Sequence, residues 1–173
     1  MPRPKLIPDQ TIFSAVRTLL TAAGDKAATF GAVSRQTGLA APTLVQRYGS
    51  QEGMVRAALM DAWDALDRAT DAAEGAADLS VKGAQTLLKS LGAEAGDSAD
   101  LSLLAADFRD PALRDRAIAR RARVEQALSL RLGGGTKGRE AAALLFAAWQ
   151  GQMLWQAAGG RGFKLKDALK RIT

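Results

Sequence analysis

Apolar residues recur every three or four positions along most of this chain, which is the spacing of an α-helix with one buried face. The pattern is clear in the first segment, where Asp9 can cap a helix and Gly24 can end it. The apolar side of this helix carries Ile12, Val16, Leu19, Leu20 and Ala23. No stretch alternates apolar and polar residues with an excess of β-branched side chains, so no strand is expected. The pattern predicts an all-α fold.

Two short helices are predicted next, on either side of a glycine. Thr29 can cap the first helix, which turns Phe30 and Val33 inward. Gly38 ends this helix, because a tight turn between helices needs a positive φ that glycine adopts at little cost. Pro42 falls in the first turn of the second helix, where its missing N–H costs nothing. Two helices joined in this way are typical of a helix-turn-helix DNA-binding unit.

Longer helices are predicted in the rest of the chain. Ser50 can cap a fourth helix, although Gly53 stands where a capping box has Glu or Gln. The carboxylates of this helix are expected to form a solvated face rather than a cation site: Asp61, Asp64, Asp67 and Asp71. Further helices are expected over about residues 79–91, 101–108, 111–132, 140–158 and 165–172.

Two segments near the end of the chain stand out. Residues 133–138 read GGGTKG and are predicted to be a flexible connection, because no strand precedes them and the GxxxxGK[ST] spacing of a phosphate loop is absent. Residues 140–158 are apolar almost all round, which a helix can be only if several of its faces are buried.

The composition narrows the classes of function. The 173 residues include no cysteine and no histidine, which excludes disulfides, zinc sites built on these residues, and Ser-His or Cys-His nucleophiles. We therefore expect no enzyme, no metal site and no cofactor. The longest apolar run, residues 141–149, is too short to span a membrane, and the N-terminal arm does not have the pattern of a signal peptide. A cytoplasmic protein without membrane contact is expected.

Charge is unevenly distributed along the chain. Residues 1–56 hold seven Lys and Arg against three Asp and Glu, residues 57–110 hold four against eleven, and residues 111–173 hold thirteen against four. A basic N-terminal unit is the electrostatic footprint of a module that binds phosphate groups. A basic surface that only faces solvent has the same composition, so charge alone does not decide between the two readings.

The second helix of the hairpin carries donors for base edges and phosphates, namely Thr43, Gln46 and Arg47. The wider run resembles the DNA-binding domain of TetR-family transcriptional regulators. The similarity covers about residues 9–60 and rests on Thr29, on the turn from Ser34 to Gly38, on Thr43-Leu44 and on the run YGSQEGM at 48–54.

This resemblance implies a three-helix DNA-binding domain over residues 1–50 and a helical effector-binding and dimerisation domain over residues 51–173. The hairpin would grip phosphates around its ends and lay its second helix in the major groove. Val45 departs from the family pattern, which has an aromatic residue there, and Gln51 replaces a lysine that contacts phosphate. The predicted DNA-binding residues are Thr29, Ala41, Thr43, Gln46, Arg47, Tyr48 and Gln51.

Specific recognition of a palindromic operator in double-stranded DNA requires two such hairpins related by a dyad, so a homodimer is expected. Residues 140–158, helped by the short final helix, are the best interface candidate. Small residues there permit close approach and two tryptophans supply buried area: Ala147, Ala148, Gly151, Trp149 and Trp155. The family builds a four-helix bundle from its last two long helices, whereas the last helix here is about two turns long.

The resemblance also implies a small-molecule effector that binds in the second domain and spreads the two DNA-reading heads. The candidate lining residues are Trp63, Leu104, Phe108, Phe146, Trp149 and Met153. Aromatic and methionine side chains at helical spacing belong to a core more often than to a pocket. Because the candidates are apolar, the expected effector is aromatic or lipid-like.

The predicted function is a DNA-binding transcriptional regulator, a repressor that a small apolar ligand releases from its operator. The alternative is a helical module that binds a protein partner and has no DNA sequence specificity. A steep dependence of DNA affinity on salt would favour the regulator, since neutralised phosphates release counterions.

Overall fold

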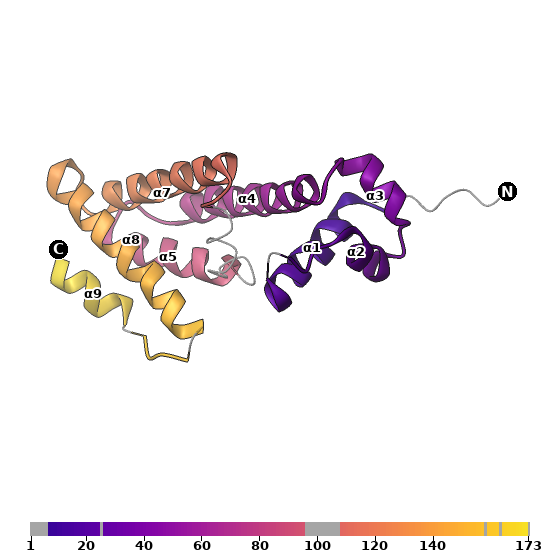
Figure 1. Cartoon of the computed structure of the whole chain (residues 1–173). Helices are drawn as coiled ribbons and strands as arrows, with labels where there is room; N and C mark the ends of the chain where they lie inside the picture. Colours follow the sequence, from indigo (N-terminus) through magenta and orange to yellow (C-terminus); the bar gives the residue numbers. More distant parts are fainter. Residues whose placement is uncertain (1–6, 25, 96–107, 158, 163, 173) are drawn as a thin grey trace. The chain divides into compact units, whose positions relative to one another are not determined.

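The computed structural model describes residues 7–24, 26–95, 108–157, 159–162 and 164–172, and Figure 1 shows their helices. These residues form no strand, which confirms the all-α prediction. None of their helices is long and apolar enough to cross a membrane. The helices are α1 (Asp9–Ala23), α2 (Phe30–Thr37), α3 (Ala41–Tyr48), α4 (Gln51–Ala76), α5 (Val81–Ala95), α7 (Pro111–Arg131), α8 (Gly135–Ala157) and α9 (Leu165–Ile172).

The described residues divide into two compact units. Unit 1 holds the residues up to Asp64 together with 108–113, and unit 2 holds residues 65–95 and those from Arg114 onward. Helix α4 therefore contributes its N-terminal part to unit 1 and its C-terminal part to unit 2. The buried apolar side chains of the first unit are Ile12, Val16, Leu20, Ala28, Val33, Leu44, Met54, Ala58, Leu59, Ala62, Trp63 and Leu113.

Helix α1 begins and ends where the sequence predicted, but Asp9 does not cap it. Pro8 occupies the N-cap position, and no side chain caps the helix. Asp9 is the first helical residue, and its Oδ1 accepts a hydrogen bond from the Tyr48 hydroxyl at 2.6 Å. The predicted cap is wrong because a donor from α3, distant in sequence, takes the carboxylate. Gly24 ends α1 with a φ of 76°, as predicted.

Helices α4 and α5 each follow a serine, and their first turns have the same hydrogen bond. The Ser50 hydroxyl accepts from the Gly53 N–H at 3.0 Å, and the Ser80 hydroxyl accepts from the Gly83 N–H at 3.0 Å. The chain before each serine lies against this turn, so that a Cβ on Gly53 would stand 2.4 Å from the Tyr48 carbonyl oxygen. Glycine replaces the Glu or Gln of a capping box because a Cβ has no room there.

Unit 2 packs α5, α8 and α9 with α7 and the end of α4. Helix α5 begins at Val81, two residues later than predicted, because Ser80 serves as its cap. Helix α9 has the predicted bounds, whereas the helix predicted over residues 101–108 lies outside the described residues except for Phe108. The core consists of Ala73, Ala77, Ala84, Leu87, Leu88, Leu91, Val124, Ala127, Leu128, Ala142, Leu145, Phe146 and Leu169.

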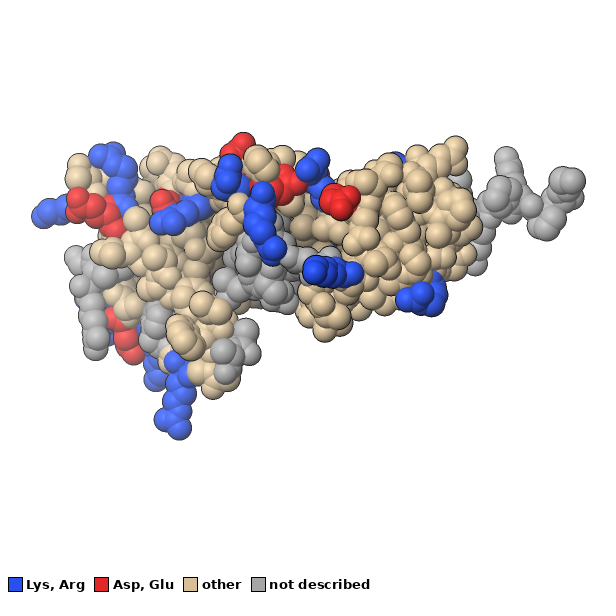
Figure 2. All heavy atoms as spheres, viewed as in Figure 1, with Lys and Arg blue, Asp and Glu red and all other residues tan. Residues whose placement is uncertain are grey.

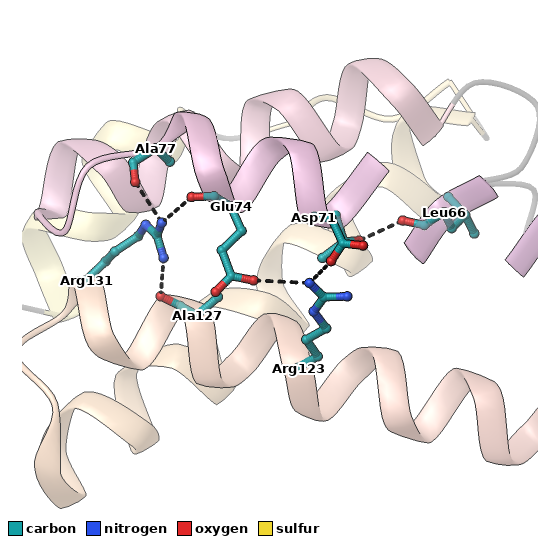
Figure 3. A network of polar contacts seen from close by, with 8 residues as sticks. Leu66, Asp71, Glu74, Ala77, Arg123, Ala127 and Arg131 are labelled. Atoms are coloured by element: carbon teal, nitrogen blue, oxygen red, sulfur yellow. Dashed lines mark hydrogen bonds and ion pairs between the residues drawn. The ribbon is translucent and has the colours of Figure 1, made fainter. Parts of the chain in front are cut away.

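The acidic side of α4 carries ion pairs. Arg116 of α7 donates to Asp67 at 2.7 Å. Arg123 of α7 pairs with both Asp71 and Glu74, and its Nη2 lies 3.5 Å from Glu74 Oε2 (Figure 3). In unit 1, Asp61 is likewise bonded, to Arg17 at 3.0 Å and to the Gln10 amide at 2.6 Å. Asp71 stays 60% exposed while it is paired, so this side of α4 faces solvent as expected, and the ion pairs are an addition that depends on partners far away in the sequence.

Arg131 joins the last residue of α7 to the end of α4. Its guanidinium donates to the carbonyl oxygens of Glu74 at 2.8 Å and Ala77 at 2.7 Å, and also to that of Ala127 at 2.9 Å (Figure 3). The carbonyls in the last turn of a helix have no partner within the helix. Arg131 is only 4% exposed, so this one side chain supplies the missing donors where water has little access.

The connection between α7 and α8 is shorter than the sequence predicted. Helix α8 begins at Gly135, so the second half of GGGTKG forms its first turn and is not a flexible loop. Gly133 and Gly134 make the turn itself, with positive φ values of 91° and 65°. After a short glycine turn the chain can enter a helix at once, here just before Thr136. The high glycine content of the segment hid this helix start from the sequence-based prediction.

Helix α8 is not buried on all its faces within the single chain. Leu144 is 64% exposed, Leu154 39% and Trp155 65%. The exposed or half-exposed positions 144, 148, 151 and 155 follow one another at spacings of four, three and four, which places them on one side of the helix. We call this side the α8 stripe. It is an apolar surface that the described part of the chain does not cover.

Candidate nucleic-acid interface

Helices α2 and α3 form the hairpin that the sequence predicted. The Thr29 hydroxyl caps α2 by accepting from the Ala32 N–H at 3.1 Å. Gly38 adopts the left-handed conformation, with φ 73° and ψ 5°, and so turns the chain from α2 into α3. Val33 and Leu44, one on each helix, are fully buried. The inner residues of the hairpin thus fix its geometry and leave the other side of α3 for contacts with a partner.

The outward side of α3 carries few residues, and they differ in chemistry. An amide suits an adenine edge, a guanidinium suits guanine or phosphate, and an exposed aliphatic group suits the methyl of thymine. Val45, 44% exposed, supplies the aliphatic group. The sequence marked it only as a departure from a family pattern and did not assign it a contact. The exposed residues are Pro42, Val45, Gln46 and Arg47, and the half-buried ones are Ala41 and Thr43.

The predicted phosphate contacts lie at the ends of this hairpin. Thr29 is exposed beside the first N–H groups of α2, and Gln51 is half-buried as the first residue of α4. Helix N-termini attract anions through their unpaired N–H groups and the helix dipole. Arg35 is exposed on α2 and adds a cation that sequence reasoning did not assign. The sequence did contain a signal for this cation, because Arg35 lies in the last turn of α2, three residues before Gly38.

Arg47 and Tyr48 are held against the start of α1. Arg47 Nη1 donates to the Ile7 carbonyl oxygen at 2.9 Å and lies 3.4 Å from Asp9 Oδ1. Burial and the Asp9 carboxylate raise the pKa of Tyr48, so its hydroxyl remains a donor. The Tyr48 ring packs against Phe13, with ring centroids 6.1 Å apart. The Tyr48 side chain thus ties the end of α3 to α1 through its ring and its hydroxyl.

Arg17, Arg47 and Arg56 of unit 1 pair with carboxylates of the same unit. Arg17 pairs with Asp61 at 3.0 Å, and Arg56 Nε pairs with Asp110 at 2.5 Å. This bond lowers the pKa of Asp110, whose other oxygen accepts the Ala112 N–H at 2.9 Å and so caps α7. On the face seen in Figure 2, few charged side chains lie over α2 and α3. The positive footprint of the unit is therefore smaller than its composition suggests.

Three of the predicted effector-binding residues come together in unit 2. The Phe146 and Trp149 rings lie 5.7 Å apart between centroids. A Cβ on Gly92 of α5 would lie 3.8 Å from Trp149 Nε1 and 3.9 Å from Met153 Sδ. Phe146 is 1% exposed and belongs to the core, with Trp149 packed against that core. These are ordinary van der Waals distances, so Gly92 of α5 faces Trp149 and Met153.

The remaining candidates are not part of this group. Trp63 is buried and belongs to unit 1. Phe108 is 55% exposed, and Leu104 lies outside the described residues.

Solved structures similar to this fold include the following three. A TetR-like transcriptional regulator from Rhodococcus sp. RHA1 has a TM-score of 0.74 at 16% identity, with 99% of this chain and 94% of that chain covered. A TetR-family member from Streptomyces coelicolor A3 has 0.72 at 20% identity, with 94% of both chains covered. The multidrug binding protein EbrR, complexed with imidazole, has 0.66 at 20% identity, with coverage of 97% and 94%.

These likenesses extend over nearly the whole chain and establish the fold, which is that of TetR-like transcriptional regulators. No family model matches the sequence, and no curated protein matches it.

Proposed function

We propose that this protein is a homodimeric transcriptional regulator of the cytoplasm that binds a palindromic site in double-stranded DNA. The observation that carries the proposal is the hairpin of α2 and α3, whose second helix exposes Val45, Gln46 and Arg47 from a capped and buried frame. In this proposal α3 enters the major groove, and residues 1–50 form the DNA-binding domain with residues 51–173 as the effector and dimerisation domain. The predicted contact residues remain those assigned from the sequence, with Val45 and Arg35 added.

Arg47 is suited to a phosphate or a guanine because only one end of its guanidinium is engaged. Both contacts to the start of α1 are made by Nη1. A partly anchored guanidinium loses less freedom on binding than a free one. Asp9 and the Ile7 carbonyl therefore support a DNA contact by holding Arg47 in place at the end of α3.

Arg47→Ala is expected to weaken operator binding by about 1–3 kcal/mol, because it removes a charge-assisted contact. The operator is first obtained by sequencing the genomic fragments that the purified protein retains. The dissociation constant is then measured by gel-shift titration. Arg139→Ala is the control, since it removes an equal charge from an exposed side chain of unit 2 and should leave the affinity unchanged. Equal affinities for Arg47→Ala and the wild type would remove Arg47 from the interface.

A second copy of the chain is the proposed partner of the α8 stripe. Two-fold dimers bring the same surface of each protomer together, and a straight apolar stripe is self-complementary in this way. Leu144 and Trp155 supply the large side chains, while Ala148 and Gly151 between them permit close approach. Leu169 of the short α9 is buried in the core of its own unit.

Leu144→Asp is expected to convert the dimer into a monomer at micromolar concentration, because dimerisation would bury an unpaired carboxylate. Light scattering measures the mass. Leu130→Asp places the same change at a similarly exposed leucine of α7, 53% exposed, and should leave the dimer intact. A monomeric wild type, or a dimeric Leu144→Asp protein, would contradict the proposed interface.

The regulator is proposed to act as a repressor that a small apolar ligand releases. Support comes from the apolar group of Trp149 with Phe146 and of Trp149 and Met153 with Gly92, and from the similar protein EbrR, which is named a multidrug binding protein. The test is release of the protein from its retained fragments by a panel of hydrophobic compounds. A protein-binding module without sequence specificity would instead retain fragments with no common sequence.

A further inference from the structure

Arg120 occupies an unusual place on α7. Counting along the helix, Arg120, Val124, Ala127 and Arg131 follow one another at spacings of four, three and four, so they share one side. Val124, Ala127 and Arg131 are all buried, at 0%, 2% and 4% exposure. This side faces the interior of unit 2. Arg120 thus extends a strong cation from the inward side of the helix.

Arg116 and Arg123 of α7 pair with carboxylates of α4, whereas Arg120 has no ionic partner within the described residues, and its Nε, like that of Arg131, has no acceptor there. Arg116 is bonded to Asp67, Arg123 to Asp71 and Glu74. Arg120 Nε is buried and has no hydrogen-bond partner, and no ion pair of Arg120 occurs among the described residues. Burial lowers the pKa of Arg120, and the nearby Asp67 carboxylate only partly opposes this effect. The carboxylates on this side of α4 are already taken by the other two arginines.

The Arg120 side chain as a whole is half-buried, but its Nε is buried without an acceptor, and such an N–H is costly. A ligand that carries an acceptor can remove this cost. The surroundings indicate which anion fits. Val124, one turn further along the same side of α7, is apolar and buried, so a free inorganic anion would lose its hydration with little return. An organic anion buries an apolar body and brings its charge only at one end.

We propose that Arg120 is the anchor for the carboxylate of an amphipathic organic acid, whose apolar part lies against the core of unit 2. The inference rests on the proposed function in one respect, since it gives the apolar effector an acidic head group. Arg120 would form charge-assisted hydrogen bonds with the carboxylate through Nε and its amino groups, which are the strong bonds of this class. The ligand then completes the row of ion pairs between α4 and α7.

The test is isothermal titration of the full-length protein, without DNA, with octanoate and with octanamide below their aggregation concentrations. Hexanoate and decanoate extend the series. Wild-type protein is expected to bind the best carboxylate at least about tenfold more tightly than the amide of equal length. Arg120→Met should abolish this difference. Arg121→Met, which removes an adjacent arginine that is exposed and pairs with Glu125, should preserve it.

A second measurement guards against a misfolded variant. Arg120→Met without ligand is expected to melt about 2–4 °C higher than the wild type, because a partly buried and unpaired charge is replaced by an apolar side chain of similar length. A lower melting temperature would contradict the proposal, because it would mean that Arg120 stabilises the unliganded fold.

Three results would overturn the site: equal binding of carboxylate and amide, binding of no carboxylate in the series, or unchanged carboxylate binding by Arg120→Met. Tight binding of inorganic phosphate at the same arginine would overturn the amphipathic class. The titration contains no DNA, so its failure leaves the DNA-binding proposal to the gel-shift measurement. An unchanged operator affinity in Arg47→Ala likewise leaves the titration of Arg120 unaffected.

Discussion

Arg131→Met is expected to lower the free energy of unfolding by about 3 kcal/mol, because the carbonyls of Glu74 and Ala77 lose donors at a site with little water, at about 1–3 kcal/mol each. Removal of the cation recovers some of its own burial cost, so the full sum is not expected. Urea denaturation monitored by circular dichroism gives the value.

Two further variants make the result specific to the bonds of Arg131. Arg131→Lys keeps the charge but lacks the planar set of donors, and it should lie between Met and the wild type. Arg121→Met removes an exposed arginine of the same helix and should change stability by no more than about 0.5 kcal/mol. If Arg131→Met unfolds at the wild-type urea concentration, the three carbonyl contacts contribute nothing to the stability of unit 2.

Gly53→Ala is expected to destabilise unit 1 by roughly 1–3 kcal/mol, because the new Cβ overpacks a closed turn. The atom it meets, 2.4 Å away, is the backbone carbonyl oxygen of Tyr48, which cannot rotate aside. Tyr48 is the last residue of α3, so the strain falls on the helix proposed to read DNA. The operator affinity should therefore decrease together with the melting temperature.

Gly75→Ala is the matched control in the same helix. A Cβ there meets nothing within 4 Å. Alanine should raise stability by about 0.5–1 kcal/mol, since it restricts the unfolded chain and favours a helix. The two substitutions are chemically identical, so opposite signs would isolate the turn at Ser50 as the cause. A Gly53→Ala protein that melts at the wild-type temperature would show that the turn opens without cost.

The order and extent of the helices could be predicted because their ends depend on neighbouring residues. Thr29 with Ala32, Ser50 with Gly53, and Asp110 with Ala112 are contacts two or three residues apart, and a sequence pattern records them directly. Where a distant partner decides, prediction was wrong. Asp9 lost its role as a cap to Tyr48, a residue of another helix.

The candidate site was predicted as a set of residues but not as a geometry. The hairpin and the exposure of Gln46 and Arg47 follow from local pattern. The anchoring of Arg47 on Ile7 and Asp9 does not, because it depends on how α3 packs against α1. The exposed Arg35 and the unpaired Arg120 were missed for the same reason, since a cation in a sequence carries no sign of whether a carboxylate will reach it.

The internal pairing of Arg17, Arg47 and Arg56 has a consequence for how such a protein would search a genome. Attraction to random DNA depends on free cations that displace counterions, and here much of that charge is already neutralised by carboxylates of the same unit. Residence on unrelated sequence would be brief, and the affinity would fall less steeply with salt than the composition of residues 1–56 suggests. Discrimination between the operator and other DNA would then depend on base contacts made by a short helix. Long-range attraction to DNA would be weaker, and fewer molecules would occupy non-specific sites.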